Sequence, residues 1–256
     1  MSDCNPASTL MEQNLKLSKS MALDTAEGKK EMKKVPYQEL VGGLLYLAVA
    51  TCPNISYAVG VLCRFIDNPG HLHWVMAKRL LQYLKGTVDL KLMYSLSSSP
   101  DWFTTYSGAD LSGNPDNSQS TGGFMICVGG GAVQWGSRLQ PHVLLSSTES
   151  EYTIASKVTC EVMWMRHLFE EIGYDMSRPS LLLLDNKSVI QVAKHPEHQS
   201  MMKHVHWAYH WIRDHVDRKL ISVSHVPGDL NPADVFTKPL GRLKFLRFRS
   251  MLGLHT

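Results

Sequence analysis

The chain has 256 residues, of which 44% are hydrophobic and 19% are charged, and its formal net charge is +3. This composition is ordinary for a globular protein and excludes a chain too polar to bury a core. The mild positive charge is compatible with a polyanionic partner such as nucleic acid, but it does not establish one.

The first part of the chain is predicted to be helical after a polar leader. Residues 1–34 show no sustained periodicity, which predicts a flexible N-terminal segment. Residues 35–89 are expected to form a small helical unit. Turn residues such as Asn68-Pro69-Gly70 and Gly86 separate its three helices, which are expected at residues 36–50, 55–66 and 72–84.

Short strands follow, joined by turns rich in Gly, Asn, Pro and Ser, as is typical of an antiparallel meander. They are expected at residues 90–95, 102–107, 123–128 and 132–135. Gly129-Gly130-Gly131 indicates a tight hairpin and not a phosphate-binding loop, because no Lys-Ser or Lys-Thr follows before a helix.

A long helix is expected next. Thr148 with Glu151 three residues later has the pattern of a capping box, and apolar residues follow at helical spacing. The remaining elements alternate between strand and helix, at residues 181–184, 187–193, 203–216, 220–225 and 231–236. This order predicts an α/β domain over residues 90–240, with a mixed five-stranded sheet flanked by helices.

Four acidic residues fall where such a fold would gather them. Asp110, Glu151, Asp185 and Asp234 each lie near the end of a predicted strand or the start of a predicted helix. Converging carboxylates repel one another unless a cation compensates them, so the set predicts a site for Mg²⁺ or Mn²⁺.

Each acidic residue also has an ordinary explanation when it is taken singly. Asp110 and Asp234 are common residues of turns and caps, and Asp185 would serve as a helix N-cap, with Asn186 as an alternative. Glu149 competes with Glu151, since both lie at the start of the long helix. Only the joint pattern favours a metal site.

Four segments of the chain are informative when they are taken together, namely residues 106–110, 145–152, 184–188 and 231–240. They resemble the ribonuclease H region of copia-type long-terminal-repeat retrotransposon Pol polyproteins. Residues 40–47, 51–55, 68–69 and 79–86 are similar to the segment that joins the reverse-transcriptase thumb to ribonuclease H in the same polyproteins. The polymerase motif Tyr-x-Asp-Asp is absent, so we expect no polymerase activity from this chain alone.

The resemblance implies a ribonuclease H-like fold that cuts RNA in RNA–DNA hybrids. It also implies a second partner in the polymerase portion of a full-length Pol protein, and a location in a cytoplasmic virus-like particle or the nucleus. Two Mg²⁺ or Mn²⁺ ions would be held by Glu151, Asp185, Asp234 and a fourth carboxylate. His225 matches a histidine thought to move protons or assist product release.

The fourth carboxylate departs from the family pattern. The family sequence is Ser-Asp-Ala-Asp, whereas this chain has Gly108 at the expected first aspartate and retains Asp110. Asp110 would share a strand face with Gly108 but lie about 6.6 Å further along. We therefore expect impaired cleavage with hybrid binding retained. The alternative is a non-catalytic nucleic-acid-binding or structural remnant.

Substrate contacts are also implied by the match. They fall on Asn186, Lys187, Ser188, His204, His210 and Arg213. The histidine-rich stretch around residues 195–215 suggests zinc as an alternative, but it lacks an HExxH glutamate and any cysteine partner. Residues 241–256 form a basic C-terminal tail, in which a helix with a solvated basic face is favoured over contact with nucleic acid or a membrane surface.

The location of the chain follows from three further features. Its longest apolar stretch, residues 40–50, is too short to span a bilayer, and the polar N-terminus lacks a signal-peptide pattern. Five scattered cysteines without a CxxC pair favour neither a disulfide framework nor a zinc ribbon. We therefore expect an intracellular chain with no membrane partner.

Overall fold

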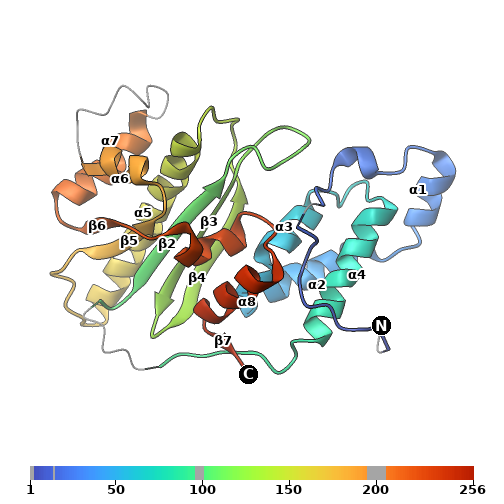
Figure 1. Ribbon diagram of the computed structural model, residues 1–256, viewed down its shortest axis with the longest axis horizontal. Helices are drawn as coiled ribbons and strands as arrows, with labels where there is room; N and C mark the ends of the chain where they lie inside the picture. The colour runs from blue at the N-terminus through green and yellow to red at the C-terminus, as the bar shows by residue number, and fades with distance from the viewer. Residues whose placement is uncertain (1–2, 14, 96–100, 195–205) are drawn as a thin grey trace.

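A mixed five-stranded sheet lies at the centre of the computed structural model, which describes residues 3–13, 15–95, 101–194 and 206–256 (Figure 1). Its strands are β2 (Thr104–Asp110), β3 (Thr121–Val128), β4 (Gly131–Leu139), β5 (Ser180–Leu184) and β6 (Ile221–His225). The strand order is β4-β3-β2-β5-β6. The first three strands pair antiparallel, and β2, β5 and β6 pair parallel. The predicted mixed sheet is confirmed.

The turn between β3 and β4 depends on glycine. Gly129 and Gly130 have φ values of 56° and 78°, in the left-handed region that side chains other than glycine disfavour. The sequence Gly129-Gly130-Gly131 is therefore a hairpin, as predicted.

Three helices cover one face of the sheet (Figure 1). They are α5 (Ser147–Glu171), α6 (Lys187–Lys194) and α7 (His206–Asp217). Val158 and Val162 of α5 are fully buried in one hydrophobic cluster with Leu182 of β5 and Val223 of β6. Burial of this apolar stripe fixes the long helix against the sheet.

The N-terminal helices pack against the other face. They are α2 (Tyr37–Ala50), α3 (Ser56–Cys63), preceded by the 3₁₀ turn η2 (Pro53–Ile55), and α4 (His71–Lys85). Leu44, Leu62 and Leu80 share one hydrophobic cluster with Met125 of β3 and with Phe236. The helical unit therefore has no separate core. Residues on both sides of the predicted boundary near residue 90 pack into the same hydrophobic cluster.

The N-terminal segment was predicted to be flexible, but its described residues pack on the helices. Leu10, Met11 and Leu17 are buried, and the chain forms η1 (Lys19–Met21) and α1 (Ala26–Met32). The approach is close, since a Cβ at Gly70 would lie 1.9 Å from the Met21 carbonyl oxygen. The apolar residues of an extended segment follow the surface beneath it, so they have no regular spacing that the sequence would reveal.

The C-terminal residues are also part of the fold. Phe245 and Phe248 of α8 (Arg242–Met251) are buried, and the following strand β7 (Leu254–His255) pairs with β1 (Lys91–Leu92). The strand expected at residues 90–95 is thus shorter and lies outside the main sheet. The last predicted helix is 3₁₀ and not α, as η5 (Pro232–Phe236), preceded by η4 (Gly228–Leu230). No helix among the described residues is both long and apolar enough to cross a membrane.

One hydrogen bond tests whether the helical unit docks on the sheet in solution. The Trp135 Nε1–H of β4 donates to the carbonyl oxygen of Ala48 in α2 at 2.8 Å. We expect Trp135→Phe to lower the free energy of unfolding by about 1 kcal/mol, measured by urea denaturation. Trp102→Phe is the control, because Trp102 makes a bond of the same length to Asp175 at an exposed site and should lose less. Equal losses would contradict the docked arrangement.

Candidate functional site

The predicted acidic residues lie around the ends of β2 and β5. Asp110 is the last residue of β2, Asp185 directly follows β5, Glu151 is in the second turn of α5, and Asp234 is in η5. Asp185 lies close enough to Glu151 to raise the pKa of that glutamate, and Asp234 lies close enough to Asp185 to raise the pKa of Asp185. The fold therefore gathers residues that are more than 100 positions apart in the sequence.

The start of α5 decides between the two candidate glutamates. Ser146 is the N-cap, its hydroxyl accepting from the Glu149 N–H at 3.1 Å, and the Glu149 carboxylate accepts from the Leu145 N–H at 2.9 Å. The predicted capping pair of Thr148 and Glu151 is therefore wrong. Ser146 caps the helix two residues before Thr148, and Glu149 is the glutamate that bonds back to the preceding chain. Glu149 is thus occupied by the cap, and Glu151 is free to face the site.

Asn186 links the glutamate to the next helix. Its Oδ1 accepts from the Ser188 N–H at 2.9 Å and caps α6, while its Nδ2 donates to Glu151 Oε1 at 3.3 Å. Asn186, and not Asp185, is therefore the cap of this helix. Lys187 and Ser188 remain exposed at the helix start.

Asp234 is the most buried of the four acids, and two lysines hold it. Its side chain is 5% exposed. The Lys238 ammonium lies 2.9 Å from Oδ1, and the Lys244 ammonium lies 2.8 Å from Oδ2. Both carboxylate oxygens therefore have a cationic partner within the chain.

Asn231 fastens this segment to the sheet beside Gly108. Its Nδ2 donates to the Ser107 carbonyl oxygen at 3.0 Å, and its Oδ1 accepts from the Ala233 N–H at 3.2 Å. A Cβ on Gly108 would lie 3.4 Å from that Nδ2 and 3.8 Å from the Ala233 Cβ. Position 108 thus faces η5 with room for the first atom of a side chain.

Asp110 lies two residues beyond Gly108, at the end of β2. Its carboxylate lies over the turn that follows β2, since a Cβ on Gly113 would come within 2.2 Å of Asp110 Oδ2. A role for Asp110 as the fourth metal ligand stays a prediction.

The site has more negative charge than its environment favours. Burial, followed by repulsion from Asp185, raises the pKa of Glu151 to about 8. Burial also raises the pKa values of Asp185 and Asp110, and Asp234 adds to both shifts. Burial lowers the pKa of Lys238, but attraction by Asp234, Asp110 and Asp185 outweighs it, so that the pKa is raised overall.

The residues present do not fit a two-metal centre as they stand. Glu151 Oε2 and Asp185 Oδ1 are buried acceptors without a hydrogen-bond partner, as expected of a set of acidic ligands. However, the oxygens of Asp234 are held by lysines, and position 108 supplies no carboxylate. Across the described parts of the chain, no three His, Cys, Asp or Glu residues are placed to hold one ion.

The other predicted site residues lie nearby or outside the described chain. His225 is exposed at the end of β6 and pairs in register with Leu184, the residue before Asp185. His210 is exposed on α7, and Arg213 on the same helix forms an ion pair with Asp217 at 3.4 Å. His204 lies outside the described residues.

Sequence reasoning missed both lysines. Lys238 follows Asp234 by four residues, a spacing that brings side chains together on a helical turn and was a usable signal. Lys244 lies on α8, in a segment interpreted as a tail, and only the packing of α8 brings it to Asp234.

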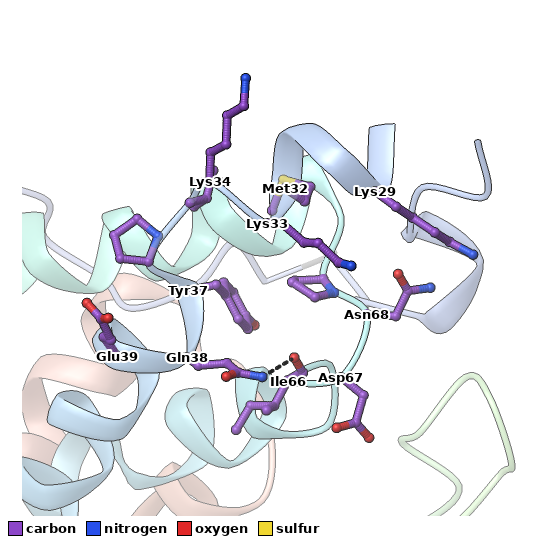
Figure 2. A pocket seen from close by; sticks show the side chains of 13 residues that line it. Lys29, Met32, Lys33, Lys34, Tyr37, Gln38, Glu39, Ile66, Asp67 and Asn68 are labelled. Atoms are coloured by element: carbon purple, nitrogen blue, oxygen red, sulfur yellow. Dashed lines mark hydrogen bonds between the residues drawn. The ribbon is translucent and has the colours of Figure 1, made fainter. Parts of the chain in front are cut away.

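A cavity of about 500 Å³ lies elsewhere, between α1 and the loop that joins α3 to α4 (Figure 2). Lys29 and Lys33 lie at its rim, and Gln38 Nε2 donates to the Ile66 carbonyl oxygen across its floor at 3.4 Å. None of the predicted site residues lines this cavity.

Comparisons with known proteins place the whole chain among transposon proteins. No protein-family model matches. The sequence is 38% identical over all 256 residues to the "Retrovirus-related Pol polyprotein from transposon TNT 1-94" of Nicotiana tabacum, of which it spans 19%. It is 34% identical over 93% of its length to the corresponding polyprotein from transposon RE2 of Arabidopsis thaliana, of which it spans 16%. The crystal structure of LC11-RNase H1 with an RNA/DNA hybrid matches 53% of this chain and 93% of its own, at 12% identity and a TM-score of 0.37.

Proposed function

Because the chain belongs to the family of retrovirus-related Pol polyproteins from copia-type transposons, we propose that residues 104–236 are a ribonuclease H-like region that binds RNA–DNA hybrids and cuts them poorly. The polyprotein relatives are more than five times longer than this chain, so the proposal concerns this region alone.

The state of Asp234 carries the proposal of poor cleavage. Metal-dependent cleavage of a phosphodiester requires carboxylates that converge on the metal ions. Here the two oxygens of Asp234 contact Lys238 and Lys244, and Gly108 contributes no carboxylate. A misplaced or missing ligand of this kind lowers the rate by orders of magnitude.

Hybrid binding uses different groups. Lys187 and Ser188 are exposed at the start of α6 beside the acidic residues, and His210 is exposed on the neighbouring helix α7. Cationic and hydroxyl groups in such positions can contact phosphates and 2′-hydroxyls of an A-form helix. This binding does not require the carboxylates to hold metal.

Binding is tested by fluorescence anisotropy with a labelled RNA–DNA hybrid in EDTA, where cleavage cannot occur. We expect Lys187→Ala to weaken binding about fivefold and to reduce the slope of log Kd against log salt by about one. Arg218→Ala is the matched control, because Arg218 is an exposed cation beyond the opposite end of α7 and should have a smaller effect. Failure to bind the hybrid more tightly than a DNA duplex of the same sequence would contradict the proposed function.

A further inference from the structure

We propose that Lys238 is an internal counter-cation that takes the electrostatic place of a divalent ion, so that the acidic site folds and persists without metal. Lys238 contacts Asp234 Oδ1 directly at 2.9 Å. Its charge also acts on Asp110, Glu151 and Asp185. A single ammonium group thus contacts one of the four carboxylates and attracts the other three.

The backbone after η5 aims this side chain. The Lys238 N–H donates to the Asp234 carbonyl oxygen at 3.3 Å, and the Thr237 hydroxyl donates to the same oxygen at 3.2 Å. These bonds continue the helical turn for one more residue, and Pro239 then ends it. Lys238 therefore lies one turn after Asp234, at the i,i+4 spacing that brings the two side chains together.

Apolar residues support the stem of the lysine. Leu10 and Met11 of the N-terminal segment line a small pocket together with Tyr57, Phe245 and Lys238 itself. A lysine can bury its methylene groups along such a surface while its charged end points elsewhere. The lysine thus lies between an apolar pocket and the Asp234 carboxylate that its ammonium contacts.

Lys244 also contacts Asp234, but its surroundings differ from those of Lys238. It contacts Asp234 Oδ2 at 2.8 Å, and its ammonium lies 5.1 Å from the centre of the Phe248 ring. Among the shifted carboxylates, the charge of Lys238 acts on Asp110, Glu151 and Asp185, and that of Lys244 acts on none of the three. Lys244→Met therefore removes an ion pair of the same kind without uncovering the rest of the site.

Occupancy by Lys238 and by a divalent ion should exclude one another, because both need the same face of Asp234. With Lys238 removed, the repulsion among the carboxylates is uncompensated, and a divalent ion is the cation that would relieve it. The chain should then gain a dependence on divalent ions that the unaltered protein lacks.

The test compares the melting temperatures of the unaltered chain, Lys238→Met and Lys244→Met in EDTA, in Mg²⁺ and in Mn²⁺, with KCl added to match the ionic strength. The unaltered chain should melt at the same temperature in all three. Lys238→Met should melt lower in EDTA and recover by about 3–6 °C when the divalent ion is about tenfold above its dissociation constant. Lys244→Met should melt lower without recovering. A general loss of packing would lower the melting temperature in all conditions alike.

The proposal is overturned if Lys238→Met shows no divalent response or if Lys244→Met shows an equal one. If Lys238→Met does not fold in EDTA, Lys238→Met combined with Glu151→Gln should restore folding, because it removes one ionisable acid from the site and leaves fewer carboxyl groups that need a counter-cation. Failure of the double variant to fold would also overturn it. No nucleic acid enters this test, so its failure is distinct from failure of hybrid binding.

Discussion

Replacing Gly108 with aspartate is expected to raise cleavage of an RNA–DNA hybrid by about 100-fold or more in Mn²⁺. Position 108 faces η5, and its first side-chain atom would make only ordinary contacts with Asn231 and Ala233. The added carboxylate would therefore project from the face of β2 that lies against η5, where Asp234 is located. It would also raise the negative charge of the site, which favours a divalent ion over the single charge of Lys238.

Two further variants separate the effect of the added charge at position 108 from the effect of side-chain size. Gly108→Asn has nearly the same size as Gly108→Asp without its charge, and it should remain as inactive as the unaltered chain. Asp185→Asn on the Gly108→Asp background should abolish the gain, since Asp185 would be a ligand of the restored site. Cleavage by Gly108→Asn at the rate of Gly108→Asp would show that the charge is not what position 108 lacks.

Glu151→Gln is expected to stabilise the protein at alkaline pH and to leave its stability nearly unchanged at pH 5. The pKa of Glu151 in the folded protein is about 8, whereas an unfolded glutamate has a pKa of about 4.3. Between these values the folded state binds the proton and the unfolded state does not. The unaltered chain therefore loses free energy of unfolding as the pH rises from about 5 to about 8.

Glutamine does not ionise, so the variant escapes this loss. We expect the difference in free energy of unfolding to grow from near zero at pH 5 to about 2–4 kcal/mol at pH 9, measured by urea denaturation in EDTA. Asp110, whose pKa shifts in the same direction, is present in both chains and largely cancels in the difference. Glu171→Gln, at an exposed position of the same helix, should show no such growth. A gain that is the same at every pH would contradict the assignment.

Local patterns were sufficient to predict most of the fold. The buried run at residues 181–184, the glycines at 129–131 and the helical spacing after Ser147 each reflect contacts made within one element or one turn. The sheet followed from the order of these elements. The N-terminal segment was missed because its buried residues, such as Leu10 and Leu17, contact helices far along the chain and follow no period of their own.

The site was predictable only in part, for a similar reason. Motif spacing identified Glu151, Asp185 and Asp234, which the fold brings close together, and it identified Gly108 as a departure. The sequence around an acidic residue does not show which lysine the fold will bring to its carboxylate. Lys244 reaches Asp234 because α8 packs beside η5, and the charge of Lys238 reaches Glu151 because the fold brings the start of α5 near η5.

Incubation of a labelled RNA–DNA hybrid with an excess of the unaltered chain, in Mg²⁺ and in Mn²⁺, tests the central claim most directly. A native gel would report binding, and a denaturing gel of the same sample would report the length of the RNA. We predict a bound hybrid whose RNA stays intact in both metals, while Gly108→Asp cuts it under the same conditions. Cutting by the unaltered chain that is lost in Asp185→Asn would contradict the account, because the site would then bind catalytic metal despite Gly108 and Lys238.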